Sequence, residues 1–276
     1  MRNPFQYGSV VGGSAFCNRT QEIRDLVRAA ENADKLFIYS ERPMGKTSLV
    51  LHALGTLPKH AYTTAYVDLG PSDGPVSFVT ATAKAIAESM GSTAEQVLKA
   101  AKEFFGQLTP SVTLDEQGKP KVTFGLTRTS SASPQLEQVL GAPAEIASRG
   151  KKRVVVIFDE MQRILEYESD TVERQLRSII QRHEAVSYLF LGSRKHLIQK
   201  MFLDRSRPLY RSAGHYPLGP IGARHWVPFI SKKFRESGKA IPDDVMAAVG
   251  EHTGGHLSTP NICVTRFGSF VSQARR

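Results

Sequence analysis

Residues 40–47 read Ser-Glu-Arg-Pro-Met-Gly-Lys-Thr, and they lie between the apolar run 36–39 and a segment with a helical pattern. This stretch differs at one position from the phosphate-binding loop G-x-x-x-x-G-K-[S/T], because Ser40 stands where the first glycine is expected. In such a loop Lys46 reaches the β- and γ-phosphate oxygens, and the hydroxyl of Thr47 holds Mg²⁺. We therefore expect ATP to be bound by Ser40, Glu41, Arg42, Pro43, Met44, Gly45, Lys46, Thr47 and Ser48.

The departure at Ser40 predicts a weakened loop. A serine adds strain if the loop needs a positive φ at this position. Glu41 places a negative charge near a polyanion unless its side chain faces away. The alternative is a chance Gly-Lys-Thr at the start of a helix, against which the preceding strand and following helix both argue.

A second apolar run, 154–158, ends in the carboxylates Asp159 and Glu160. Ligands of open α/β sheets bind at the carboxyl ends of parallel strands, so this pair is expected at such an edge. Asp159 is predicted to hold Mg²⁺ through water, and Glu160 to act as the general base on the attacking water. The alternative is that both carboxylates are a solvated strand end.

A third apolar run, 188–191, is followed by Gly192 and Ser193. Ser193 is a candidate sensor of the γ-phosphate, and the alternative is an ordinary turn after a strand. Arg174, Arg177 and Arg182 lie on the helix predicted between the two strands. One of them is a candidate arginine finger towards a neighbouring subunit of a homo-oligomer, and the alternative is a solvated helix face.

The alternation of strand and helix patterns predicts a three-layer α/β/α sandwich with a mostly parallel sheet. The domain prediction is a core at 1–218, with a hairpin and loop insertion at 104–134, followed by a small helical lid at 219–276. Residues 127–134 are predicted to be a polar loop. Strands are expected at 36–39, 62–69, 111–115, 121–124, 154–158 and 188–191, and helices at 21–34, 45–57, 76–90, 93–105 and 171–183, with another that ends near 148.

The composition is that of a globular protein with a formal net charge of +10. A basic surface favours nucleic acid or an acidic partner. The Lys and Arg residues form no dense block, however, and the alternative is that they are spread over solvated faces. No segment has the apolar length to span a bilayer, and the first residues carry no apolar signal region. Cys17 and Cys263 form no metal-binding or disulfide spacing, so we expect a cytoplasmic protein without a membrane partner.

Several motifs in the same order resemble those of the archaeal-type ATPases, P-loop NTPases related to the AAA+ and STAND groups. The N-terminal stretch is similar to the family signature at Asn3-Pro4-Phe5, Gly8, Val11, Gly13, Phe16, Arg19 and Glu22-Ile23. The loop at 42–49, the strand end 158–164, the segment 192–194 and the lid motif Thr253-Gly254-Gly255-His256 resemble the corresponding family motifs.

The resemblance implies ATP and Mg²⁺ binding, slow hydrolysis and a conformational switch driven by the nucleotide. It places Val11 and Phe16 on the adenine side, and it brings His256 of the lid towards the phosphates. Two other functions stay open, a regulator that senses the nucleotide without turnover and an ATPase associated with DNA. The sequence identifies neither the partner nor the oligomeric state.

The tail from Leu257 departs from the family pattern, which usually continues with proline, an aromatic residue and glutamine. Back-translation with free choice of third bases, read from the third base of the His256 codon, allows Pro-Leu-Tyr-Thr-Gln-His-Leu-Cys-His. We therefore hypothesise that a single-base shift replaced the native C-terminus and left an incomplete lid. The alternative is a short natural tail.

Overall fold

The computed structural model describes residues 10–13, 16–40, 44–106, 108–125, 132–236 and 238, of which 132, 133 and 223 are described by their backbone alone. Glu41, Arg42 and Pro43 of the loop lie outside the described residues, as do His256 and the tail from 257.

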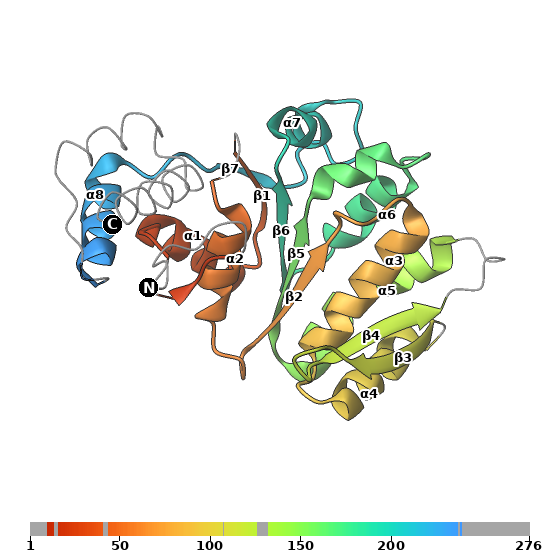
Figure 1. Ribbon diagram of the computed structural model, residues 1–276. Coiled ribbons are helices and arrows are strands. Elements are labelled where there is room, and N and C mark those ends of the chain that lie inside the picture. Colours follow the sequence, from red (N-terminus) through yellow and green to blue (C-terminus); the bar gives the residue numbers. More distant parts are fainter. Residues whose placement is uncertain are drawn as a thin grey trace, which may run out of the picture. The chain divides into compact units, whose positions relative to one another are not determined.

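A five-stranded sheet has the order β2-β5-β6-β1-β7 (Figure 1). Its strands are β1 (Lys35–Tyr39), β2 (Tyr62–Asp68), β5 (Arg153–Asp159), β6 (Val186–Gly192) and β7 (Gly214–Pro217). Strands β2 and β5, β5 and β6, and β6 and β1 pair in parallel, so the predicted mostly parallel sheet is confirmed. The strand that leads into the loop is therefore separated from the strand with the acidic end by β6.

The burial of β5 and β6 explains why these two strands can be predicted from the sequence. Strand β6 is buried along its whole length, and β5 is buried from Val154 onwards. Parallel strands covered on both faces need continuous apolar runs, which 154–158 and 188–191 supply. In the register, Tyr39 faces Gly192 and Asp68 faces Asp159, so the carboxyl ends of all four parallel strands meet at one edge of the sheet.

The large apolar core contains residues from the sheet and from the helices that pack on it, including Phe37, Phe78, Phe158, Tyr188 and Phe202. The α-helices are α1 (Thr20–Glu31), α2 (Lys46–Gly55), α3 (Pro75–Ser89), α4 (Ala94–Phe105), α5 (Ala132–Gly150), α6 (Thr171–Ile180), α7 (Lys195–Leu203) and α8 (Ala223–Glu236). No helix among the described residues is both long and apolar enough to cross a membrane.

The predicted hairpin is confirmed as an antiparallel pair, β3 (Thr109–Leu114) and β4 (Pro120–Gly125), which packs with α3 and α4 (Figure 1). The predicted polar loop 127–134 is wrong at its end, because α5 already begins at Ala132. Proline and small polar residues fit the first turn of a helix, where the N–H groups have no intrahelical acceptor. Ser133 and Pro134 therefore start a helix here, although their composition is typical of a loop.

Three short elements have no counterpart in the sequence prediction. They are the 3₁₀ helix η2 (Met161–Glu166), helix α7 and strand β7. Strand β7 has four residues and contains both glycine and proline, which are rare in strand interiors.

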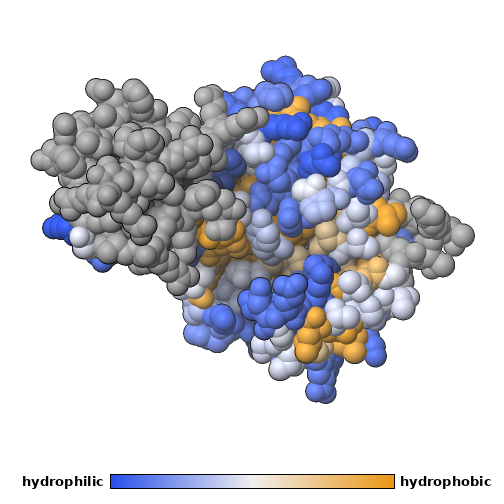
Figure 2. Space-filling model, viewed as in Figure 1, coloured by the Kyte–Doolittle hydropathy of each residue, from blue (hydrophilic) through white to orange (hydrophobic). Residues whose placement is uncertain are grey.

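The chain forms two compact units. We call residues 1–25, 40–55 and 217–276 the loop unit, and residues 26–39 and 56–216 the sheet unit. The loop unit has its own small apolar cluster, formed by Cys17, Ile221, Trp226, Ile230 and Phe234. On the visible face of the sheet unit, hydrophobic residues occupy small separate areas in a mostly hydrophilic surface (Figure 2). The predicted division into a core at 1–218 and a lid at 219–276 stays a prediction.

Candidate functional site

The loop begins where β1 ends, and it continues directly into α2. Gly45 has a φ of +71°, a left-handed conformation that glycine adopts without strain. Its carbonyl accepts the N–H of Leu49 at 2.9 Å, so the helix is already formed at this point. The first N–H groups of α2 have no acceptor within the helix, and together with the helix dipole they make this end attractive to an anion.

Ser40 and Lys46 are bonded to each other within the loop unit. The ammonium of Lys46 donates to Oγ of Ser40 at 2.8 Å, and Lys46 is only 8% exposed and Ser40 only 3% exposed. Ser40 is not among the residues with a positive φ, so the strain that a positive φ would impose is not present there. A serine at the position of the first glycine therefore gives the buried lysine a hydroxyl acceptor that glycine lacks.

The N-terminal lead-in contacts α2 at two places. The backbone N–H of Val11 donates to Oγ of Ser48 at 3.0 Å. The ring of Phe16 stacks on His52 with a centroid separation of 4.3 Å and an interplanar angle of 12°. Val11 and Phe16, predicted for the adenine side, thus lie against the helix that follows the loop.

Arg19 connects three segments of the loop unit, a role that the sequence analysis did not assign to it. Its guanidinium donates to Glu22 at 2.7 Å, to the carbonyl of Met44 at 3.4 Å and to that of Gly219 at 2.7 Å. The side chain is buried and its φ is +70°. Its place in the N-terminal motif that resembles the family signature was the available signal in the sequence.

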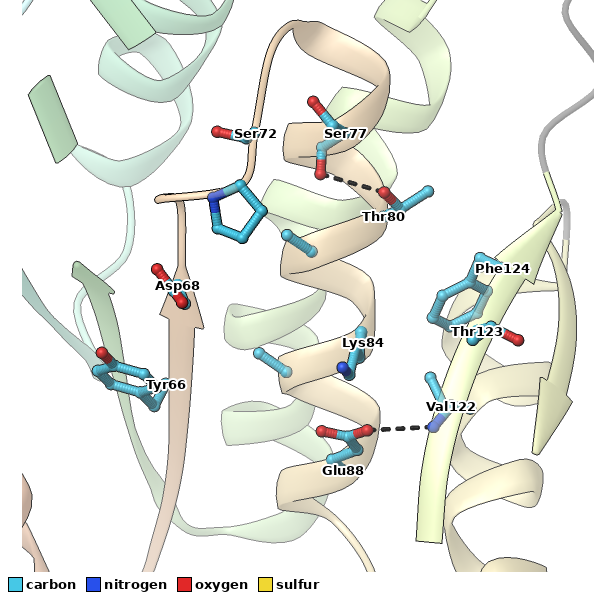
Figure 3. A pocket seen from close by; sticks show the side chains of 13 residues that line it. Tyr66, Asp68, Ser72, Ser77, Thr80, Lys84, Glu88, Val122, Thr123 and Phe124 are labelled. Atoms are coloured by element: carbon cyan, nitrogen blue, oxygen red, sulfur yellow. Dashed lines mark hydrogen bonds between the residues drawn. The ribbon is translucent and has the colours of Figure 1, made fainter. Parts of the chain in front are cut away.

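Asp159 is fixed by two hydrogen bonds in the sheet unit. Its Oδ1 accepts the N–H of Glu160 at 2.8 Å, and its Oδ2 accepts the hydroxyl of Tyr66 at 2.7 Å. Tyr66 lies on β2 and was missed in the sequence, since only the pairing of β2 with β5 brings it to Asp159. Tyr66 and Asp68 also line a cavity of about 570 Å³ that extends around α3 to Phe124 of β4 (Figure 3).

Glu160 and Ser193, predicted separately, are brought together. The hydroxyl of Ser193 donates to Oε2 of Glu160 at 2.8 Å. The amide nitrogen of Gln162 donates to the same oxygen and, at 3.3 Å, to Oγ of Ser193. Glu160 has φ 52° and ψ 37°, which is an uncommon left-handed conformation for a residue other than glycine. The acidic end of β5 and the end of β6 therefore form one polar cluster.

The profile of the family described as "ATPase domain predominantly from Archaea" matches residues 16–256. The chain belongs to this family. No curated protein matches the chain.

The archaeal ATPase domain shares its fold with solved structures. The Walker-type ATPase PABY2304 of Pyrococcus abyssi gives a TM-score of 0.59 at 20% identity, over 90% of this chain and 66% of that one. The ORC2 protein of Aeropyrum pernix, in ADPNP–ADP complexes, gives 0.59 at 14% identity, over 99% of this chain and 67% of that one. The ORC1 protein of Aeropyrum pernix, in complex with DNA, gives 0.57 at 15% identity, over 96% of this chain and 62% of that one.

These structures confirm the predicted P-loop ATPase fold, with a mostly parallel sheet and flanking helices. The archaeal ATPase domain spans about two thirds of the length of each of them.

The donor set at the acidic edge fits Mg²⁺ if phosphate and water supply the other ligands. Among the described residues, no group of three or more His, Cys, Asp or Glu is placed to hold a metal ion. Mg²⁺ is usually held by one or two carboxylates together with substrate phosphates and water, rather than by a cage of protein ligands. Asp159, paired in register with Asp68 and held by hydrogen bonds on both of its oxygens, offers such a carboxylate.

The three candidate finger arginines all have partners. Arg174 forms an ion pair with Asp170 at 2.8 Å, Arg177 donates to the carbonyl of Tyr210 at 3.0 Å, and Arg182 donates to the carbonyl of Ser178 at 3.0 Å. Arg177 thus makes a contact within its own chain, to the carbonyl of Tyr210. A finger role for any of the three arginines stays a prediction.

Proposed function

We propose that this archaeal ATPase domain binds ATP with Mg²⁺, hydrolyses it and uses the cycle as a conformational switch. The junction of Gly45 and Lys46 is the observation that carries the proposal. Gly45 is in a left-handed conformation and has no side chain that would keep an anion away from the start of α2. The buried ammonium of Lys46 follows it directly in the sequence and is hydrogen-bonded to Ser40. The match of the family over residues 16–256 supports the same reading.

Binding is assigned to the residues of the loop unit. Lys46 and the N–H groups at the start of α2 would hold the β- and γ-phosphates, and Thr47 would contribute its hydroxyl to Mg²⁺. Val11 and Phe16 would contact the adenine, since both lie against α2 near the loop. His256 is proposed to approach the phosphates from the lid.

Hydrolysis is assigned to the acidic edge of the sheet unit. Bound Mg²⁺ would neutralise charge on the phosphates, and Asp159 would hold it through water. Glu160 would accept a proton from the attacking water, and Ser193 would respond to the γ-phosphate. The cluster that joins Glu160 to Ser193 supports this assignment, because one hydrogen bond links the proposed base to the proposed sensor.

Calorimetry with Mg-ATP on the wild-type chain and on Lys46→Ala tests the binding step. Lys99→Ala, on an exposed position of α4, is the matched control. We expect binding to disappear in Lys46→Ala and to persist in Lys99→Ala. Equal binding by Lys46→Ala and the wild type would refute the assignment of the loop.

Phosphate release from Mg-ATP tests the hydrolysis step in the wild type and in Glu160→Gln. Glu95→Gln, exposed on α4, is the control. We expect Glu160→Gln to bind ATP without turnover, while Glu95→Gln behaves as the wild type. A wild type that binds ATP with no more turnover than Glu160→Gln would identify a nucleotide-sensing regulator instead of an enzyme.

Contact with DNA is a second candidate function, favoured by the net charge of +10. Binding of a labelled 30-base-pair duplex of mixed sequence, followed by fluorescence anisotropy, is expected to weaken steeply with salt, because phosphate contacts release counterions. Absence of binding at about 50 mM salt, where electrostatic contacts are strong, would exclude this function for the chain alone.

A further inference from the structure

Gln162 has a buried side chain that is only half satisfied. It lies in the 3₁₀ helix after Glu160 and is 2% exposed. Its amide nitrogen donates to Oε2 of Glu160 and to Oγ of Ser193, whereas its Oε1 has no hydrogen-bond partner among the described residues. A buried amide oxygen without a donor destabilises a fold, so a residue of this kind needs another reason to be there.

The orientation of this amide follows from its surroundings. Turning it over would place Oε1 against the carboxylate of Glu160, where two acceptors repel each other. The end of β6 also leaves room for the amide oxygen, because Gly192 has no side chain. A Cβ at this position would lie 2.7 Å from Oε1 of Gln162 and 2.0 Å from Cγ1 of Ile198.

The contacts of Glu160 are asymmetric. Its Oε2 accepts both the Gln162 amide and the Ser193 hydroxyl, and no hydrogen bond to its Oε1 is found in the described part of the chain. Hydrogen bonds to a charged acceptor are stronger than those between neutral groups. One carboxylate oxygen is therefore anchored, and the other is left to act as an acceptor.

We propose that Gln162 is a positioning residue for hydrolysis, which anchors Oε2 of Glu160 and leaves Oε1 to the attacking water. This inference rests on the proposed ATPase function. A general base has to be held close to its productive geometry, and the left-handed backbone of Glu160 does not by itself fix the carboxylate. Ser193 alone would leave a single donor on this oxygen, which restrains the direction of the carboxylate less than two.

The test uses Gln162→Met, which removes the donor and keeps the volume of the buried side chain. Gln181→Met, at the exposed end of α6, is the matched control. Single-turnover hydrolysis of bound Mg-ATP separates the chemical step from binding and product release. We expect the rate to fall by on the order of 10- to 100-fold in Gln162→Met, the effect of a general base that is no longer held in its productive orientation, and to stay unchanged in Gln181→Met.

The affinity for ATP and the melting temperature are measured on the same variants. Both are expected to stay near the wild-type values in Gln162→Met, because Gln162 is not proposed to touch the nucleotide and the substitution also removes a buried oxygen without a partner. A residue with a purely structural role would instead lower the melting temperature. If Gln162→Met fails to fold, Gln162→Asn keeps the amide but shortens its reach, and the same loss of rate is expected.

The outcomes separate the two proposals. A wild type that hydrolyses ATP, together with a Gln162→Met rate within about twofold of it, would overturn the positioning role alone. A wild type that is no faster than Glu160→Gln would overturn the proposed hydrolysis, and the positioning role with it. A slow Gln162→Met with wild-type affinity supports both.

Discussion

Replacing Ser40 by alanine should tighten ATP binding, although it removes a native hydrogen bond. The hydroxyl of Ser40 accepts the ammonium of Lys46 at 2.8 Å where both residues are buried. If Lys46 turns to the phosphates in the complex, this bond has to be broken during binding. Ser40→Ala removes it from the free protein only, so the free state loses stability and the complex does not.

The magnitude follows from the kind of bond. A hydrogen bond to a charged group contributes about 1.5–3 kcal/mol net. Lys46 has a further interaction in the structure, so removal of the Ser40 hydroxyl takes away only part of the contacts that this residue makes in the free protein. A difference of about 1–2 kcal/mol predicts a 5- to 30-fold higher affinity for ATP. The melting temperature of the free protein should fall, and it should return to the wild-type value at saturating ATP.

Calorimetry and thermal unfolding, with and without Mg-ATP, measure these changes. Ser187→Ala is the matched control, since Ser187 is also buried and its hydroxyl donates to the carbonyl of Asp34 at 2.8 Å. Ser187→Ala should lower the melting temperature by a similar amount in both conditions and leave the affinity unchanged. An affinity of Ser40→Ala equal to or below that of the wild type would refute the argument, because it would mean that Lys46 keeps its bond to Ser40 in the complex.

Three further predictions concern the sheet unit. Tyr66→Phe removes the hydroxyl that orients Asp159 and should raise the Mg²⁺ concentration for half-maximal phosphate release about tenfold; an unchanged Mg²⁺ titration would contradict the role of this contact. Gly192→Ala places a Cβ 2.0 Å from Cγ1 of Ile198 and should lower the free energy of unfolding in urea by about 1–3 kcal/mol, whereas a neutral effect would show that Ile198 moves aside. Burial, helped by two nearby cations, lowers the pKa of His183 to about 4 from its ordinary 6.5, so the unfolded chain takes up the proton first and stability is lost as the pH falls from 6.5 towards 4. The full difference is about 3 kcal/mol, which water around the half-buried ring reduces to about 1 kcal/mol, and urea unfolding of His183→Gln should lose that part of the pH dependence.

The fold could be predicted where one strong signal decides a segment. The apolar runs that became β5 and β6 could be predicted without tertiary information, because parallel strands buried on both faces read as near-continuous apolar runs. The start of α5 was predicted wrongly because Ser133 and Pro134 are as suitable for the first turn of a helix as for a loop. Strand β7 was missed because four residues with glycine and proline carry no strand pattern.

The candidate site was predicted residue by residue, but its connections were not. Asp159, Glu160 and Ser193 were found from their places after apolar runs. Tyr66 and Gln162 have no such signature, because the contact of Tyr66 depends on the pairing of β2 with β5 and that of Gln162 on a 3₁₀ turn. For Ser40, the predicted weakening of the loop was based on backbone strain. The hydrogen bond that its hydroxyl accepts from Lys46 was not predicted.

Ser40 and Gln162 make hydrogen bonds of the same kind, to a charged group that we propose to be functional, and yet their removal should have opposite effects. Only an interaction that differs between two states changes the free energy between them. The bond of Ser40 is proposed to exist before ATP binds and to be lost on binding, so it opposes binding. The bond of Gln162 is proposed to hold the carboxylate in the orientation that the attack of water requires, so its loss removes an alignment on which the reaction depends. This difference requires a combination of three results. The wild type, Ser40→Ala and Gln162→Met should melt at the same temperature at saturating ATP, Ser40→Ala should bind ATP more tightly, and Gln162→Met should be slower in a single turnover.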